Sequence, residues 1–207
     1  MINITSAQQA DIEEIARLHE QVFIGFFLTS LGRKFLQELY AGFAVRPHGI
    51  LLVARDGREL IGFAAGTTRP QEFFSDLRRQ RGMFFLMRAL PAILRNPMPV
   101  GRKLVSAFFY RGDPPASSAS GALLSSIGVA AGYRGRALAD QLLDDFEKKV
   151  AEQGIGRVYL TTDAANNDRV NAFYRKNGYS VECQFTQNGG RSMLRYIKNI
   201  GLKKNDE

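Results

Sequence analysis

The chain has 207 residues, of which 45% are hydrophobic and 23% charged, so we expect one globular domain over residues 1–207. Its single cysteine, Cys183, excludes an internal disulfide and a cysteine-rich metal cluster, and we expect no metal. The sequence has no secretory signal and no run of about 18 apolar residues, which predicts a cytoplasmic protein.

The net charge of +8 favours an anionic partner: nucleic acid, anionic lipid or a polyanionic small ligand. The sequence contains no helix-turn-helix, zinc-finger or aromatic RNA-binding pattern, so we expect no nucleic-acid partner.

The first 70 residues predict three strands and two helices. A strand over Ile2–Thr5 precedes a helix that begins near Ser6 or Asp11 and carries apolar residues at helical spacing up to Phe23. A second helix is expected from Thr29 or Ser30 to about Gly42. Two short apolar runs, 49–55 and 60–67, flank Asp56-Gly57 and predict a hairpin.

Residues 71–121 predict a basic helical insert followed by a loop. Between Gln71 and Asp113 there are eight Lys or Arg side chains against three Asp or Glu. Apolar residues over 73–90 indicate one or two amphipathic helices, broken at Pro91 and again at 97–99, and the turn-rich residues 112–121 indicate a loop. Such an insert suits an acidic ligand, a membrane surface or a dimer contact, and an ordinary solvated basic face is the plainer interpretation.

The rest of the chain is more regular. Strands are expected at 122–129 and 157–162, helices at 135–152 and 167–176, and a closing hairpin at 179–186 and 191–198. This order predicts an α/β (α+β) fold with a mixed sheet of six or seven strands.

The turn before the helix at 135–152 is suited to hold a phosphate. The first N–H groups of a helix have no internal partner, and the helix dipole is positive there. Gly135, Ala137 and Ala139 are small enough for an anion to approach the backbone, and Arg134 and Arg136 add positive charge. An ordinary strand-to-helix turn with solvated arginines is the alternative.

The spacing around this turn resembles the GCN5-related N-acetyltransferase (GNAT) family. Residues 134–139, Arg-Gly-Arg-Ala-Leu-Ala, resemble the family loop Arg/Gln-x-x-Gly-x-Gly/Ala. Downstream, residues 167–174 and 177–179 resemble its Asn-x-x-Ala-x-x-x-Tyr helix and the Gly-Phe/Tyr that follows it. The match is close over about 120–185, and the element order extends it to the whole chain. Ala137 and Val170 stand where the family usually has Gly and Ala.

The resemblance implies a GNAT-like fold, a mostly antiparallel sheet flanked by helices, with acetyl-CoA motifs over about 122–185. It implies that the strand bearing Ile127 and Val129 pairs with the pantetheine arm, and that the loop over Arg134, Gly135, Arg136, Ala137, Leu138 and Ala139 binds the pyrophosphate. Asn167 would contact the coenzyme. Tyr174 would lie near the sulfur and protonate the leaving thiolate, since a phenol is protonated at pH 7. A helix N-cap for Asn167 and a packed aromatic for Tyr174 are the structural alternatives.

The acceptor site is less defined by the sequence. By the same resemblance, its wall would include His19, Phe23, Phe26, Phe27 and Ser30, although a histidine on a helix is more often structural. Ser125 and Ser126 are expected on opposite faces of their strand, where one of them could orient a water. Thr162 occupies the position at which ribosomal-protein acetyltransferases of the family often carry a glutamate base. This difference weakens the hypothesis that the protein acetylates ribosomal proteins.

Three functions follow. The leading hypothesis is an N-acetyltransferase for a primary amine of a small molecule, such as an amino sugar or its nucleotide conjugate. A protein or peptide N-acetyltransferase is the second, and a non-catalytic CoA-binding sensor is the third. We expect a monomer or a homodimer, with membrane-surface contact by the insert as a weaker alternative.

Overall fold

The computed structural model describes residues 1–95, 121–187 and 190–201. Seven strands form one sheet in the order β1-β2-β3-β4-β5-β7-β6. Every neighbouring pair is antiparallel except β4 and β5, which are parallel. The predicted mixed, mostly antiparallel sheet is therefore confirmed, with seven strands. They are β1 Ile2–Ser6, β2 Gly49–Asp56, β3 Glu59–Thr67, β4 Ala122–Val129, β5 Arg157–Asp163, β6 Ser180–Gln187 and β7 Arg191–Asn199.

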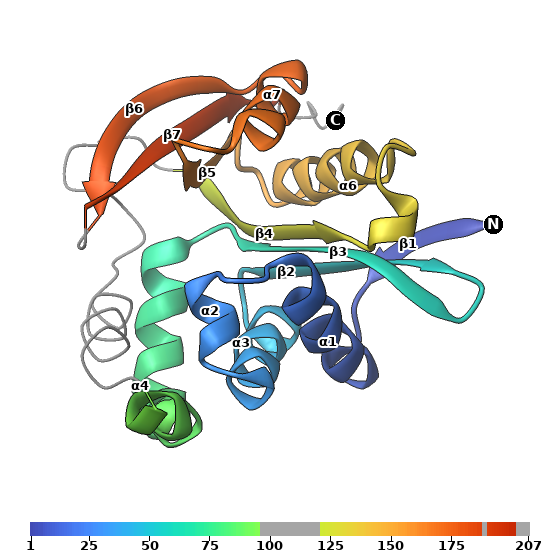
Figure 1. The fold of residues 1–207 in the computed structure, drawn as a ribbon. Helices are drawn as coiled ribbons and strands as arrows, with labels where there is room; N and C mark the ends of the chain where they lie inside the picture. The colour runs from blue at the N-terminus through green and yellow to red at the C-terminus, as the bar shows by residue number, and fades with distance from the viewer. Residues whose placement is uncertain (96–120, 188–189, 202–207) are drawn as a thin grey trace.

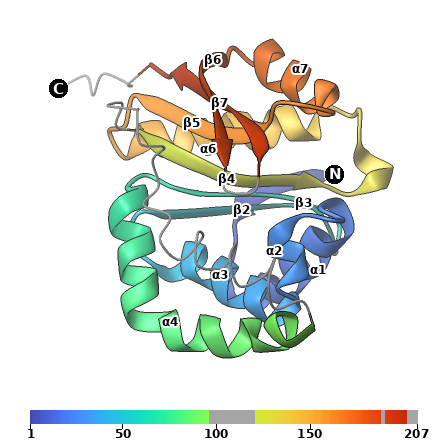
Figure 2. The ribbon, with the colours of Figure 1, turned by 60° about the vertical axis from the view of Figure 1, so that its left-hand side comes forward.

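Helices cover both faces of the sheet, as Figures 1 and 2 show. One face carries α1 Ile12–Val22, α2 Phe27–Ser30, α3 Arg33–Val45 and α4 Pro70–Arg95. The other face carries α6 Leu138–Glu152 and α7 Asp168–Lys176. Two single 3₁₀ turns, η1 Gln9–Asp11 and η2 Ala131–Tyr133, precede α1 and α6.

Each face has its own buried core. Leu138, Leu142, Phe146 and Val150 recur every four residues on α6, and all four are buried against the sheet. On the opposite face, residues of α1 and α3 pack with Phe63 of β3 and with Phe73 and Leu77 of α4. The sheet therefore separates two cores, and the end of β4 lies between them.

The second predicted helix is in fact two. The structure has one turn at α2 and a longer helix at α3, separated at Gly32, whose φ is +89°. A left-handed conformation ends helical hydrogen bonding, and glycine adopts it without steric cost. The apolar spacing continues across this break, which explains why periodicity predicted one helix.

The predicted helix break at Pro91 is wrong, because α4 runs on to Arg95. Proline removes one helical hydrogen bond, but its fixed φ is close to the helical value, so a helix can continue through it. The change of direction of α4 in Figure 2 lies nearer the middle of the helix than Pro91 does. The second predicted break at 97–99 and most of the loop at 112–121 lie outside the described residues.

None of the helices in the described part of the chain combines the length and apolar character needed to cross a membrane. Within residues 1–95, 121–187 and 190–201, no three His, Cys, Asp or Glu side chains gather as a metal site requires.

Candidate functional site

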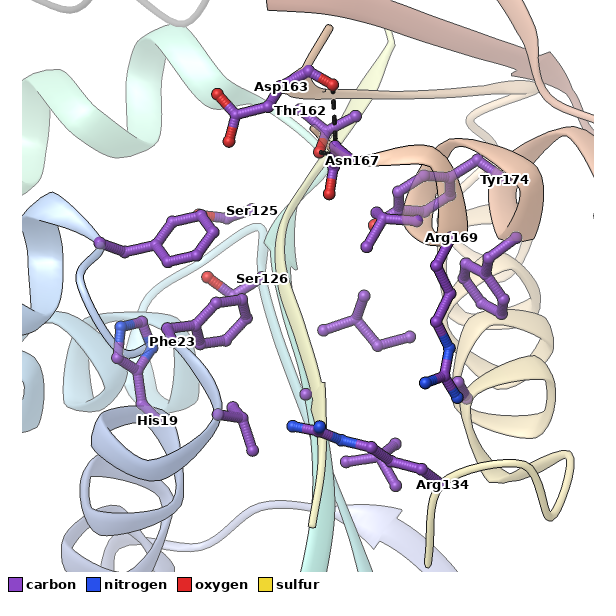
Figure 3. Close-up of a pocket in the computed structure, with 18 of the residues that line it drawn as sticks. His19, Phe23, Ser125, Ser126, Arg134, Thr162, Asp163, Asn167, Arg169 and Tyr174 are labelled. Carbon is purple, nitrogen blue, oxygen red and sulfur yellow. Dashed lines mark hydrogen bonds between the residues drawn. The ribbon is translucent and has the colours of Figure 1, made fainter. Parts of the chain in front are cut away.

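A cavity of about 790 Å³ opens where β4 and β5 diverge. The two strands pair only at Ala122 with Val158 and at Leu123 with Tyr159, and then separate. Side chains from α1, β4, the loop before α6, β5, α7 and the β6–β7 hairpin line the space (Figure 3). The cavity thus receives residues from both layers of helices, through a gap in the sheet itself.

A β-bulge sets the direction of two serines in this gap. Gly66 of β3 pairs with Leu124, whereas Ala65 pairs with Ser126, so Ser125 is an extra residue in β4. Figure 3 shows Ser125 and Ser126 on the same side of β4, toward α1. The prediction that they face opposite ways is wrong, because the bulge shifts the alternation of side chains by one residue.

The loop before α6 forms one end of the cavity. The predicted helix start at Gly135 is wrong: α6 begins at Leu138, and both Gly135 and Ala137 have positive φ, +79° and +59°. The first helical hydrogen bond runs from Gln141 to the carbonyl of Ala137, so the N–H groups of residues 138–140 have no intrahelical partner. The cavity lining here includes Ile127, Val129, Arg134, Gly135, Ala137, Leu138 and Ala139.

Arg136 is the one loop residue of the predicted donor site that does not line the cavity. Its guanidinium lies over the ring of Tyr133, 5.2 Å from the centroid. Tyr133 in turn donates a hydrogen bond to Asp56. Arg136 therefore lies on the outer side of the loop, where it contacts a tyrosine that is tied to the β2–β3 hairpin.

Ala137 is in the left-handed region, where a Cβ costs about 1 kcal/mol or more. We therefore expect Ala137→Gly to raise the free energy of unfolding by about 1 kcal/mol, measured by urea denaturation. Ala139→Gly, two residues later inside α6, is the matched control and should lower it by about the same amount. If Ala137→Gly is as destabilising as its control, the loop does not hold this conformation in solution.

Asn167 and Tyr174 enter the cavity from α7. Asn167 is the N-cap residue, but its side chain makes no cap hydrogen bond. Instead its Nδ2 donates to Thr162 Oγ1 at 2.7 Å and to the carbonyl of Asp163 at 3.2 Å, which ties α7 to the end of β5. The amide is thereby fixed at the cavity wall.

Tyr174 is buried, with 7% of its surface exposed, and it lines the cavity (Figure 3). Its ring packs against Phe173, Tyr179 and Tyr196. Burial raises the pKa of its hydroxyl well above the ordinary value, because the phenolate would lose solvation. Tyr174 therefore stays protonated near pH 7 and can act as a proton donor.

The opposite wall contains His19 and the phenylalanines that follow it. His19, Phe23, Phe26 and Phe27 line the cavity, whereas Ser30 does not. The Ser30 hydroxyl is exposed and donates to the carbonyl of Phe27. Four of the five predicted wall residues are thus brought together.

His19 is held as a neutral ring. Its Nδ1 lies 2.6 Å from the Tyr40 hydroxyl, and its ring centroid is 4.6 Å from that of Phe23. Burial lowers the pKa of His19 from 6.5 to about 4, because the imidazolium would be poorly solvated.

The unfolded chain therefore binds a proton on His19 below about pH 6.5, while the folded protein does not until about pH 4. This contribution to stability is fully present above pH 6.5 and is lost as the pH falls to about 4. We expect the difference in unfolding free energy between wild type and His19→Gln to shrink over this window in urea titrations. A difference that does not vary with pH would mean that the ring already titrates normally.

Several cavity residues carry no signal in the sequence. Arg169 of α7 faces the same end of the cavity as Arg134 (Figure 3), and Lys176 also lines it. At the other end, Arg191 of β7 forms a close two-point ion pair with Asp163, and its guanidinium lies 5.4 Å from the ring centroid of Phe26. The sequence pattern along α7 and β7 does not show which of their faces meets the cavity, so these residues can be identified only once the fold is known.

A family model described as the acetyltransferase (GNAT) family matches residues 12–179. The ribosomal-protein-S18-alanine N-acetyltransferase from Escherichia coli superposes with a TM-score of 0.59 at 11% identity, over 100% of this chain and 99% of that one. Ard1 from Thermoplasma volcanium gives 0.61 at 15%, over 97% and 98%. An N-acetyltransferase from Staphylococcus aureus Mu50 gives 0.61 at 16%, over 97% and 99%. At these identities the structural likeness shows the fold alone. A comparison with curated proteins gave no significant match.

Proposed function

The chain belongs to the GNAT family of acetyl-CoA-dependent acyltransferases, and we propose that it acetylates a primary amine of a small molecule. An amino sugar or a nucleotide-linked amino sugar is the acceptor we favour. The observation that carries the proposal is the cavity between β4 and β5, with backbone N–H groups and arginines at one end and phenylalanines at the other.

The donor end fits the pyrophosphate of acetyl-CoA. N–H groups without an intrahelical partner at the start of α6, and the positive end of its dipole, favour an anion. Arg134 and Arg169 add positive charge from two sides. The inner side of β4 at Ile127 and Val129 has no β5 partner, which leaves room for the pantetheine arm. Asn167, held by its bonds to the end of β5, would contact this arm.

Transfer proceeds by direct attack. The lone pair of the neutral amine attacks the thioester carbonyl, the C–N bond forms, and the C–S bond then breaks. Tyr174 gives its proton to the departing thiolate, and the proton lost by the amine restores the phenol through solvent. The amide and free CoA are the products, and the enzyme returns to its initial state.

The acceptor end supports a small amine rather than a bulky one. Arg191 from β7 contacts both Phe26 from the α1–α2 connection and Asp163 from β5, and all three line this side of the cavity. Exposed arginines of α4, among them Arg79 and Arg88, and the net charge of +8 would attract an acidic acceptor such as a nucleotide conjugate.

An amine panel tests the proposal, with thiol release as the signal. The panel contains free amino sugars, nucleotide-linked amino sugars, simple alkylamines and short peptides with free N-termini. We expect the sugars and their conjugates to stimulate release most, and Phe26→Ala to extend activity to larger amines. Activity confined to peptides would overturn the small-molecule assignment.

Protein or peptide N-acetylation is the second candidate. One structural neighbour is a ribosomal-protein-S18-alanine N-acetyltransferase and another is Ard1. At 11% and 15% identity, they support the fold only. Thr162 stands at the position where a glutamate base would favour ribosomal-protein acetylation, and its hydroxyl is used by Asn167. The peptide arm of the panel decides between the two candidates. Binding of CoA with no amine-dependent release would favour the sensor hypothesis instead.

A further inference from the structure

Hydrogen bonds link two residues of the cavity lining, His19 and Ser126, through the buried hydroxyl of Tyr40. His19 Nδ1 lies 2.6 Å from the hydroxyl of Tyr40, and that hydroxyl also bonds the side chain of Ser126. His19 and Tyr40 are buried, with 2% and 0% of their surfaces exposed, while Ser126 is half-buried and lines the cavity. The three residues come from α1, α3 and β4, so these hydrogen bonds connect three elements that the fold holds together.

The chemistry of the two groups favours one direction for the first bond. A neutral imidazole has one unprotonated nitrogen, which is a strong acceptor, and the phenol of Tyr40 is a strong donor 2.6 Å away. Tyr40 therefore donates its proton to His19 Nδ1. With that proton committed, the Tyr40 oxygen can only accept, so the Ser126 hydroxyl donates to Tyr40.

The consequence appears at the cavity. Ser126 has one proton, and it points toward Tyr40, so only lone pairs of its oxygen face the cavity. Ser126 pairs with Ala65, whose side chain belongs to the core on the α1 face, and this register turns Ser126 toward α1 and Tyr40. Ser125 lies beside it on the same face and lines the same cavity, but no bond from it to Tyr40 is recorded within the described residues.

We propose that Ser126, kept as a hydrogen-bond acceptor by Tyr40 and His19, receives an N–H of the acceptor amine and aims the nitrogen lone pair at the thioester. This inference rests on the proposed function. An amine N–H needs an acceptor, and a serine free to rotate could instead present its own proton and compete for the nitrogen lone pair. Tyr40 and His19 are positioning residues that act through Ser126.

Kinetics with the best amine of the panel test the inference. Ser126→Ala is expected to lower kcat/KM for the amine about tenfold, as the loss of one hydrogen bond predicts, with the KM for acetyl-CoA unchanged. Tyr40→Phe should act in the same direction. The double variant should lose about tenfold rather than a hundredfold, because both changes remove the same interaction.

Ser125→Ala is the matched control, since it removes a hydroxyl from the same bulge without breaking the hydrogen bonds to Tyr40. Its effect should multiply with that of Tyr40→Phe. The melting temperature of each variant is measured by circular dichroism. If Ser126→Ala folds poorly, Ser126→Thr takes its place in the test: it keeps the hydroxyl and is expected to retain most of the kcat/KM for the amine.

The outcomes are distinct. The inference is overturned, while the proposed function stands, if Ser126→Ala lowers the melting temperature but leaves the kcat/KM for the amine unchanged. It is also overturned if the losses of kcat/KM caused by Ser126→Ala and Tyr40→Phe multiply in the double variant. If wild-type protein acetylates no amine of the panel, the proposed function fails and the inference fails with it.

Discussion

Replacing Tyr174 with phenylalanine is expected to lower kcat about 100-fold, with little change in the KM for acetyl-CoA. A general acid contributes on this scale when it protonates a poor leaving group, and the thiolate of CoA leaves more slowly when no proton is supplied. Phenylalanine keeps the ring, so the contacts with Tyr179 and Tyr196 persist and the fold is maintained. Thiol release at saturating amine measures the effect.

Tyr179→Phe is the control for this variant. Tyr179 belongs to the same aromatic cluster, with its ring centroid 5.7 Å from that of Tyr174, but its hydroxyl donates to Glu147 on α6. Its loss should cost about 2 kcal/mol of stability, because a buried carboxylate loses a donor, and should leave kcat unaltered. Equal rates for wild type and Tyr174→Phe would rule out Tyr174 as the acid.

We expect Gly66→Ala to destabilise the protein by about 3 to 5 kcal/mol. A Cβ built on Gly66 would lie 2.1 Å from the carbonyl oxygen of Leu123 and 2.5 Å from the ring of Phe146. The first contact is with backbone, so β3 would have to move away from β4 in the centre of the sheet. Urea denaturation measures the change in unfolding free energy.

Gly132→Ala supplies the comparison, since a Cβ there meets nothing within 4 Å and its φ is not in the left-handed region. It should change stability by less than about 0.5 kcal/mol. Gly66 also lies opposite the bulge that directs Ser125 and Ser126. If Gly66→Ala and Gly132→Ala have the same unfolding free energy, β3 and β4 do not come as close at the bulge in solution as the structure shows.

The order of strands and helices could be predicted because each has a clear hydrophobic period. The hairpin at Asp56-Gly57 and the stripe on α6 are local signals, and the structure confirms both. The break at Gly32 and the start of α6 at Leu138 could not be predicted this way, because both depend on positive φ at single residues. A single residue with positive φ leaves the hydrophobic period almost unchanged, so the period does not reveal it.

The residues proposed for the donor half of the site could be selected from the sequence because they are close together in the chain and have a fixed spacing. The acceptor half is assembled from α1, β5 and β7, so its contacts are long-range. Arg191 looks like an ordinary surface cation until the fold places it against Asp163 and Phe26. The bulge at Ser125 was missed for another reason: it is a property of the register between β3 and β4, not of β4 alone.

The divergence of β4 and β5 gives this sheet two edges in its interior. Edge strands usually invite pairing by another polypeptide, and most proteins cover or charge them. Here the two edges lie between α1 and α7, and side chains from both sides, among them Phe23 and Tyr174, line the space beside them. The same gap that breaks the sheet therefore leaves two edges that the surrounding helices and side chains cover, so they are not presented to another chain as an outer edge strand would be.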